Sequence, residues 1–262
     1  MDLVDIGVNL AHRSFSGDLE TVIACAKDAG VQTLIATGSS LAGSHAVAAL
    51  TRPHIYATAG VHPHNAKDLT DHGLEELETI LRREDVVAVG ECGLDFNRNY
   101  SPREDQERAF EMQIELAASV RKPLFLHERD ASARLLDLVR RYRAKIVDAV
   151  VHCFTGTREE LSAYLDLDLH IGITGWICDE KRGKHLLELM PMIPADRLML
   201  ETDAPFLTPH DLPGYKKSMR NEPAFLPWVL RKVASARGVS AEELARATTQ
   251  TARAFFRLPM GN

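Results

Sequence analysis

Eight short apolar runs divide the chain, and they constrain its fold more than any other feature. Most are rich in leucine or β-branched residues and almost unbroken by charge, as strands are in a parallel sheet that is buried on both faces. The runs are Leu3–Val8, Thr33–Ala36, Ile55–Ala59, Val86–Val89, Leu124–Leu126, Ala149–Val151, His170–Ile173 and Leu198–Leu200. The sequence therefore predicts eight buried parallel strands.

Segments with the apolar spacing of helices lie between these runs. In Pro102–Val120, for example, Phe110, Ile114 and Ala117 recur at three- to four-residue intervals, with Ser101 as the expected N-cap. Further helices are expected over Asp18–Ala29, Leu74–Arg83, Ala131–Tyr142, Arg158–Leu165, Gly183–Leu189, Ala224–Ala236 and Ala241–Phe255, the last capped by Ser240. Strands and helices therefore alternate along the chain.

This alternation, without a linker or a break in composition, predicts an α/β fold of one domain over residues 1–262, a single (β/α)8 TIM barrel. The length of 262 residues is close to the roughly 250 that such a barrel needs. An open doubly wound sheet is the alternative, but no Gly-x-Gly-x-x-Gly turn follows the first strand. In a barrel, the carboxyl ends of the strands carry the active site.

The charge and the apolar content exclude some classes of function. A formal net charge of −6 gives no overall basic field to collect nucleic acid, so a polyanion would have to be held by a local patch or a metal. No run reaches the roughly 18 apolar residues of a membrane span, and the chain begins with no signal-like segment. We expect a cytoplasmic protein with no membrane partner.

Four of the predicted strand ends carry an acidic or imidazole side chain, namely Glu91, His127, His152 and Asp203. Each alone has an ordinary explanation: a solvated glutamate, a core histidine, or an aspartate that caps a turn. Together, on strands whose neighbours lie about 4.8 Å apart, they form a ligand set for a divalent metal. A metal at the strand ends of an α/β protein points to a hydrolase.

Two carboxylates and two imidazoles do not name the metal. Three or four histidines would favour zinc, whereas carboxylates and open positions favour magnesium or manganese. The glycines on either side of Glu91, Gly90 and Gly93, indicate a backbone that turns tightly around a fixed side chain.

Several polar residues near the same strand ends are candidates for substrate binding. His62 and His64 follow the third strand around Pro63, although a purely structural turn is the alternative. Arg129 lies two residues beyond His127, and a surface salt bridge to a neighbouring acidic residue is the alternative role for it. These side chains would bind a substrate phosphate or water.

The loop after the last strand gathers cations in an otherwise acidic chain. Lys216, Lys217 and Arg220 lie there with Tyr215, so the loop could hold a phosphodiester backbone and stack a base. A solvated loop is the alternative. Trp176, after the seventh strand, is another candidate for stacking.

Several motifs together resemble the TatD family of metal-dependent deoxyribonucleases. The match runs in order from the first strand to the last helix. The segments that carry it are Asp5–Leu10, Ala59–His64, Gly90–Phe96, His152–Gly156, Glu201–Pro205 and Arg220–Pro223.

The resemblance implies a magnesium-dependent nuclease, a 3′→5′ exonuclease acting on single-stranded DNA, with RNA as a further substrate and a role in the repair of oxidative DNA damage. It implies Glu91, His127, His152 and Asp203 as ligands of Mg²⁺, with Mn²⁺ or another divalent metal as substitutes. Many relatives carry His-x-His on the first strand, where this chain has Gly7 and Asn9. We therefore expect one well-held metal, in a monomer.

The expected reaction is phosphodiester hydrolysis, with Glu91 and Asp203 as the catalytic residues. A metal-dependent amidohydrolase acting on a small ester, lactone or amide is the first alternative, because the same barrel and ligands serve that chemistry. The second alternative is a non-catalytic binding protein built on a degenerate barrel. The basic loop argues against the first alternative, and the complete ligand set argues against the second.

Overall fold

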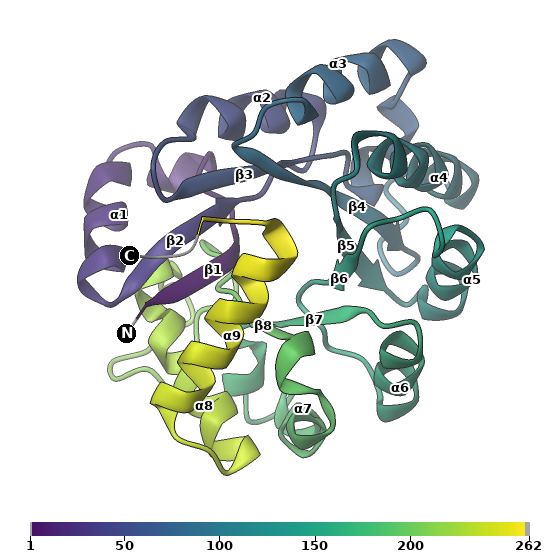
Figure 1. Cartoon of the computed structure of the whole chain (residues 1–262). Helices are drawn as coiled ribbons and strands as arrows, with labels where there is room; N and C mark the ends of the chain where they lie inside the picture. The colour runs from purple at the N-terminus through teal and green to yellow at the C-terminus, as the bar shows by residue number, and fades with distance from the viewer. Residues whose placement is uncertain (1, 260–262) are drawn as a thin grey trace. The chain divides into compact units, whose positions relative to one another are not determined.

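The computed structural model describes residues 2–259, and its strands and helices alternate as the sequence predicts (Figure 1). Eight strands follow one another in sequence order in one sheet. They are β1 (Leu3–Val8), β2 (Val31–Ala36), β3 (Ile55–Ala59), β4 (Val86–Asp95), β5 (Leu124–Arg129), β6 (Ala149–Val151), β7 (His170–Ile173) and β8 (Leu198–Leu200). The predicted (β/α)8 barrel is confirmed.

The α-helices are α1 (Leu19–Asp28), α2 (Leu41–Leu50), α3 (Asp71–Leu81), α4 (Arg103–Val120), α5 (Ser132–Tyr142), α6 (Arg158–Asp166), α7 (Lys184–Leu189), α8 (Leu226–Arg237) and α9 (Ala241–Phe256). The sequence did not predict α2, because this helix consists mostly of small and apolar residues and its faces differ little in polarity. Its first turn is capped by Ser40, whose hydroxyl accepts a hydrogen bond from Gly43 N at 3.0 Å.

One of the two predicted helix caps is wrong. Helix α4 begins at Arg103 with Pro102 at the N-cap position, so Ser101 lies outside the helix. The Ser101 hydroxyl instead donates to the carbonyl oxygen of His64 at 2.9 Å and ties the start of α4 to the turn after β3. The other cap is confirmed, since Ser240 accepts a hydrogen bond from the backbone N–H of the third residue of α9 at 3.1 Å.

The chain divides into two compact units, which are described separately. The first unit comprises residues 2–36, 153–162 and 170–259, and the second comprises residues 37–152 and 163–169. In the first unit β1 pairs with β2 and β7 with β8, all parallel. In the second unit β3, β4, β5 and β6 pair in parallel in that order. The prediction of a single domain stays a prediction.

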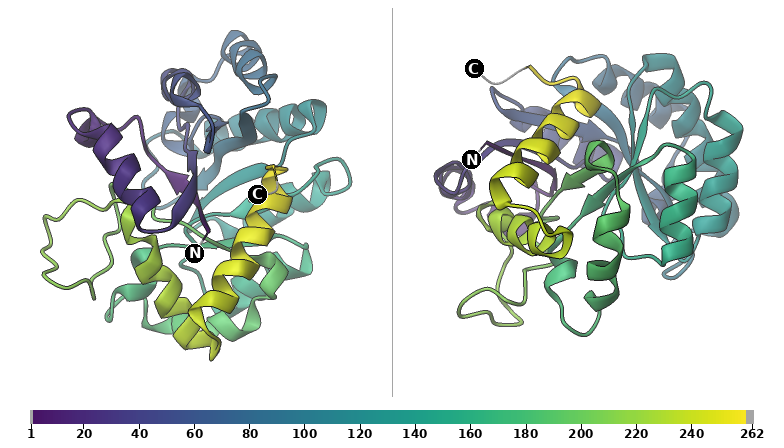
Figure 2. Two further views of the ribbon diagram at one scale, coloured as in Figure 1. Left: turned by 60° about the vertical axis from the view of Figure 1, so that its left-hand side comes forward. Right: turned by 60° about the horizontal axis from the view of Figure 1, so that its bottom comes forward.

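Apolar burial holds each unit together. Every residue of β1 and β4 is buried, as expected for strands covered on both faces. The predicted apolar stripe of α4 is confirmed, because Phe110, Ile114 and Ala117 are fully buried. In the first unit α9 packs along β1 and β8 (Figure 2). Among residues 2–259 no helix has both the length and the apolar character needed to cross a bilayer.

Candidate functional site

Glu91 lies within β4 rather than at its end, because the strand continues beyond it. Gly90 and Gly93 have backbone φ angles of +144° and +138°, which residues with a side chain rarely adopt. A Cβ at Gly90 would lie 2.2 Å from the carbonyl oxygen of Phe125. A Cβ at Gly93 would lie 2.0 Å from that of His127. The two glycines therefore let β4 approach β5 closely, and this brings Glu91 beside His127.

Three histidine rings converge on one carboxylate oxygen of Glu91. His127 Nδ1 and His152 Nε2 each lie 2.9 Å from Glu91 Oε1. His62 Nε2 lies 3.3 Å from the same oxygen. The rings come from β5, from the residue after β6 and from the turn after β3. The second unit thus brings together three of the four predicted metal ligands, Glu91, His127 and His152.

The histidines control the ionisation of Glu91. Burial alone would raise the pKa of this carboxyl, but interactions with the rings of His62 and His152 and hydrogen bonds to His127 and His152 hold it well below its usual range. Glu91 is therefore a carboxylate throughout the physiological pH range. In turn, although burial opposes it, hydrogen bonds to Asp95 and Glu91 raise the pKa of His127.

His62 occupies a different position from the other two histidines. Its Nδ1 accepts a hydrogen bond from the backbone N–H of His64 at 3.1 Å. Burial lowers the pKa of His62 and so favours the neutral ring, which carries one N–H. That proton therefore sits on Nε2, which donates to Glu91. His62 orients the carboxylate, although its ligand atom is close enough to those of Glu91 and His127 to complete a metal site.

The donor chemistry of this cluster fits a divalent cation. Atoms of His62, Glu91 and His127 that can act as ligands all lie within 4.8 Å of one another. An ionised carboxylate beside imidazole nitrogens is a donor set that divalent metals take. In the second unit a metal could be held by Glu91 and His127 together with His62 or His152.

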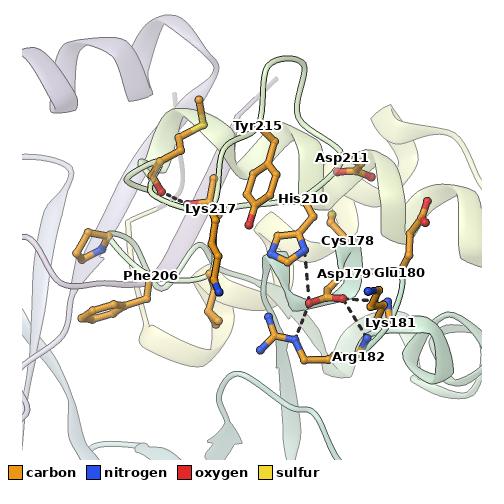
Figure 3. A pocket seen from close by; sticks show the side chains of 14 residues that line it. Cys178, Asp179, Glu180, Lys181, Arg182, Phe206, His210, Asp211, Tyr215 and Lys217 are labelled. Atoms are coloured by element: carbon orange, nitrogen blue, oxygen red, sulfur yellow. Dashed lines mark hydrogen bonds and ion pairs between the residues drawn. The ribbon is translucent and has the colours of Figure 1, made fainter.

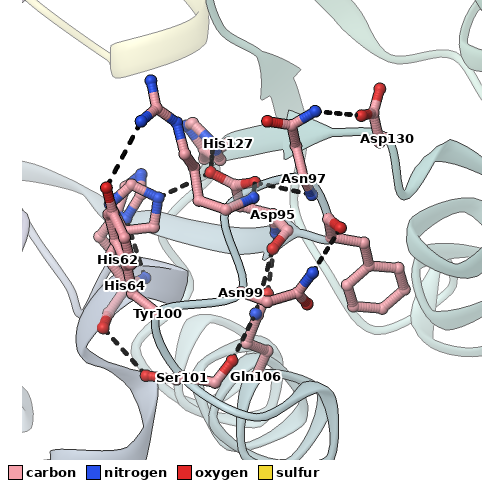
Figure 4. A network of polar contacts seen from close by, with 12 residues as sticks. His62, His64, Asp95, Asn97, Asn99, Tyr100, Ser101, Gln106, His127 and Asp130 are labelled. Carbon is pink, nitrogen blue, oxygen red and sulfur yellow. Dashed lines mark hydrogen bonds and ion pairs between the residues drawn. The ribbon is translucent and has the colours of Figure 1, made fainter.

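Asp95 contacts two histidines near Glu91, and it is a site residue that the sequence did not predict. Its Oδ2 lies 2.6 Å from His64 Nε2 and 3.7 Å from His127 Nε2 (Figure 4). Despite its burial, hydrogen bonds to His127, the backbone N–H of Arg98 and His64 hold the pKa of Asp95 far below its usual range. The available signal was periodicity, because Asp95 lies four residues after Glu91 and alternate residues of a strand share a face.

His64, predicted to bind substrate, belongs to the network drawn in Figure 4. The ring of Tyr100 meets the His64 ring edge to face, with centroids 4.7 Å apart. Tyr100 is 58% exposed, and its hydroxyl lies 3.4 Å from Arg98 Nη1. An exposed aromatic ring, an arginine and a histidine therefore line the solvent side of the second unit's cluster.

Asp203 belongs to the first unit, three residues beyond the end of β8. Its φ of +54° is in the left-handed region, and its backbone N–H donates to Gly7 O at 2.8 Å. Its Oδ1 accepts a hydrogen bond from the side-chain amide of Asn9 at 3.0 Å. Gly7 and Asn9 thus hold Asp203 in place.

A buried layer of carboxyl groups lies next to Asp203. Glu201 and Asp5 are fully buried. The Thr202 hydroxyl donates to Asp5 Oδ2 at 2.5 Å, and Glu201 Oε1 accepts from Cys153 N at 2.5 Å. Burial is the main reason that the pKa of Asp5 rises to about 7. These contacts fix the chain between β8 and Asp203.

The remaining predicted substrate-binding residues differ in their surroundings. Arg129 is the last residue of β5 and is exposed. Lys216 and Lys217 are exposed on the long loop between β8 and α8. Arg220 donates to Asp18 Oδ2 at 2.7 Å and to Glu222 Oε1 at 2.6 Å, so its guanidinium anchors the end of this loop.

Comparison with known proteins identifies the family of this chain. The chain is 51% identical to the 3′-5′ ssDNA/RNA exonuclease TatD of Edwardsiella piscicida, over 98% of this chain and all of that protein. It is 47% identical to the protein of the same name from Escherichia coli K12, over 97% of this chain and 98% of that one. The crystal structure of a TatD homologue from Escherichia coli K12 superposes with a TM-score of 0.89 at 29% identity, covering 98% of each chain. The family model for TatD related DNase matches residues 4–257, and the chain belongs to this family.

Proposed function

We propose that this protein is a metal-dependent 3′→5′ exonuclease that hydrolyses phosphodiester bonds of single-stranded DNA, and also of RNA. The observation that carries the proposal is the convergence of His127 and His152 on the ionised Glu91. Membership of the TatD related DNase family and the names of relatives about half identical to this chain support it.

The metal is Mg²⁺ in this proposal, with Mn²⁺ as a substitute. Its ligands are Glu91, His127 and His152, with Asp203 as the fourth, as the sequence predicts. Because Nδ1 of His62 already accepts a hydrogen bond, the count of ligating imidazoles stays at two, which favours magnesium over zinc. The chemistry that a bound divalent cation supplies is Lewis acidity toward a phosphate oxygen and toward water.

The side chains then have distinct roles. Asp203, oriented by Asn9, accepts a proton from the attacking water. The new bond forms between the water oxygen and phosphorus, and the bond from phosphorus to the 3′ oxygen breaks. His62, His64 and Arg129 stabilise the negative charge that grows on the phosphate. Lys216 and Lys217 hold the sugar–phosphate backbone without reading its sequence, while the ion pairs of Arg220 favour an anchoring role.

The test is digestion of single-stranded DNA labelled separately at its 5′ and 3′ ends, with Mg²⁺ and with EDTA. Wild type should give a ladder that shortens from the 3′ end, only with Mg²⁺. Glu91→Ala should give none while keeping a native circular-dichroism spectrum. If folded, metal-loaded wild type cleaves no strand but hydrolyses small esters or lactones, the amidohydrolase alternative replaces this proposal.

A monomeric state, a cytoplasmic location and a role in DNA repair belong to the same proposal. They rest on the family resemblance and on the absence, within residues 2–259, of a helix able to cross a bilayer. Light scattering of the purified protein would test the first, and the sensitivity of a deletion strain to peroxide would test the last.

A further inference from the structure

The first unit contains a pocket of about 950 Å³ that the proposed chemistry does not use, apart from the role given to Lys217 (Figure 3). It lies between the segment after β7, residues 178–182, and the loop after β8, residues 205–219. Its volume is in the upper part of the range of roughly 300–1,000 Å³ that small-molecule sites occupy. A pocket of this size suits an organic group rather than a single ion.

Close backbone packing builds the walls of this pocket. A Cβ at Gly175 would lie 2.3 Å from the carbonyl oxygen of Leu207, so the two walls touch directly at that point. The Thr208 hydroxyl donates to Met219 O at 2.8 Å, and the Asn221 amide donates to Phe206 O at 2.6 Å. Two neighbouring hydrogen bonds thus close the base of the loop after β8.

The floor of the pocket is a buried charge that fixes the residues around it. Asp179 is 5% exposed and accepts a hydrogen bond from Arg182 Nε at 2.6 Å, with His210 Nδ1 at 3.4 Å. Although burial opposes it, the bonds from Arg182 lower the pKa of Asp179 to about 2. Its charge is therefore balanced by Arg182, whose guanidinium lies 4.3 Å from the centroid of the Trp176 ring.

The lining of the pocket combines aromatic rings with the ammonium of Lys217, and it also contains Glu180 and Lys181. Tyr215 lies against the ring of His210, with centroids 4.5 Å apart. Phe206 is 49% exposed, and with Tyr100 it is one of two large hydrophobic side chains so exposed within residues 2–259. Figure 3 shows the Lys217 ammonium between Phe206 and Arg182. A flat apolar surface beside the exposed ammonium of Lys217 suits a group that is both aromatic and anionic.

Within the first unit, the pocket borders the segment that follows Asp203. Phe206 lies three residues after Asp203, and its backbone N–H donates to Asp203 O at 3.0 Å. A strand held at Asp203 would therefore pass into the pocket along this segment. Stacking on aromatic side chains contributes roughly 1–3 kcal/mol per base and tolerates any base.

We propose that this pocket binds one nucleoside monophosphate unit of the substrate strand, on the 5′ side of the bond that is cut. The base stacks on Phe206, and the phosphate contacts Lys217. This inference rests on the proposed exonuclease function. A released mononucleotide carries the same base and phosphate. The experiment must therefore distinguish a nucleotide unit within the strand from the free mononucleotide product.

The first arm measures KM for oligothymidylates of increasing length, starting from the dinucleotide, with the full-length Mg²⁺-loaded protein. In wild type KM should fall as the strand becomes long enough to reach the pocket. In Phe206→Ala and in Lys217→Ala this fall should shrink by about 10-fold, the loss of one stacked base or one backbone contact. Lys27→Ala removes an exposed lysine of α1 outside the pocket and should keep the wild-type length dependence.

The second arm measures inhibition by free thymidine monophosphate. If Phe206→Ala relieves this inhibition but keeps the length dependence of KM, the pocket binds the released nucleotide and the proposal for the strand is overturned. Unchanged behaviour in both arms overturns the pocket as a nucleotide site.

A third measurement separates this inference from the proposed function. Fluorescence anisotropy of a labelled oligothymidylate in EDTA reports binding without cleavage. If wild type binds the strand more tightly than Phe206→Ala yet cleaves nothing when Mg²⁺ is added, the exonuclease function fails and the pocket stands. If wild type cleaves and the variants match it in both KM and anisotropy, only the pocket fails.

Discussion

The side-chain amide of Asn9 donates a 3.0 Å hydrogen bond to Oδ1 of Asp203, which links the end of β1 to the segment after β8. The same amide lies 3.3 Å from Ala204 O, and the backbone N–H of Asn9 donates to that oxygen at 2.8 Å. The resemblance to the family places Asn9 at the second histidine of a His-x-His motif. In this chain the position serves to orient a carboxylate.

Replacement of Asn9 by alanine should lower kcat by about 10- to 100-fold, because a hydrogen bond to a charged group contributes about 1.5–3 kcal/mol. KM should change much less, since the amide contacts Asp203 and not the strand. Steady-state kinetics on an oligonucleotide would measure both. Asn65→Ala removes an amide whose bond goes to Ser39 O, and it is the matched control. A variant of Asn9 with wild-type kcat would remove Asp203 from the proposed role of base.

Replacement of Asp203 by asparagine should abolish turnover and leave the fold intact. The φ of +54° at this position is one that asparagine tolerates better than most residues. Loss of the carboxylate removes a group proposed both as a metal ligand and as the base. Thermal melting should give a Tm near that of wild type, whereas digestion should fall to the level seen in EDTA. Substantial residual digestion would show that another group takes the proton.

The three histidines around Glu91 should separate into two classes when metal binding is measured by calorimetry. His127→Ala and His152→Ala each remove a ligand and should weaken Mg²⁺ or Mn²⁺ binding beyond the roughly 10- to 100-fold typical of lost outer-shell partners. His62→Ala should stay within that range and yet lose activity, because His62 Nε2 donates to Glu91. Equal losses of affinity in all three variants would make His62 a ligand and would favour a zinc-like site.

Asp5 should impose a pH dependence on stability. Its pKa is raised from 3.8 to about 7 in the folded protein, chiefly by burial, with Thr202 opposing and Glu201 adding to the rise. A raised carboxyl pKa means that the folded state binds the proton more tightly. This contribution to the free energy of unfolding is therefore complete below pH 3.8 and is lost as the pH rises through about 7.

Asp5→Asn imitates the protonated form, so its unfolding free energy should fall less between about pH 4 and pH 7. Above pH 7 the variant should be more stable than wild type, by up to a few kcal/mol, since one pKa unit corresponds to about 1.4 kcal/mol. Urea titrations of both proteins in EDTA across this range would measure the difference. Parallel profiles would mean that Asp5 is ionised, or absent from the titration, in the folded state.

Much of the fold could be predicted because alternation and burial are local properties of the sequence. The eight apolar runs became β1–β8, and the stripe of α4 packed as expected. Helix α2 was missed because Leu41–Leu50 has no polar face to reveal the helical period. The end of β4 was placed too early, because Gly90 and Glu91 resemble a strand end when only propensity is considered.

The sequence could predict which residues come together in the site, but not the hydrogen bonds that they make. Glu91, His127 and His152 converge as expected, because parallel strands bring their ends to one edge. The hydrogen bond from His64 N that separates His62 from the ligands depends on the turn around Pro63, which no spacing rule describes. The contact of Asp95 with His64 depends on how far β4 extends.

The two glycines that flank Glu91 also matter for anyone who wishes to transplant this centre. A designer who copied only the histidines and carboxylates onto another barrel would leave the two strands that carry them at the ordinary separation of neighbouring strands. Glu91 would then stop short of the imidazole on the adjacent strand. The smallest motif that could be transferred is therefore a pair of adjacent strands that includes Gly90 and Gly93. The histidines and carboxylates alone would not reproduce the cluster.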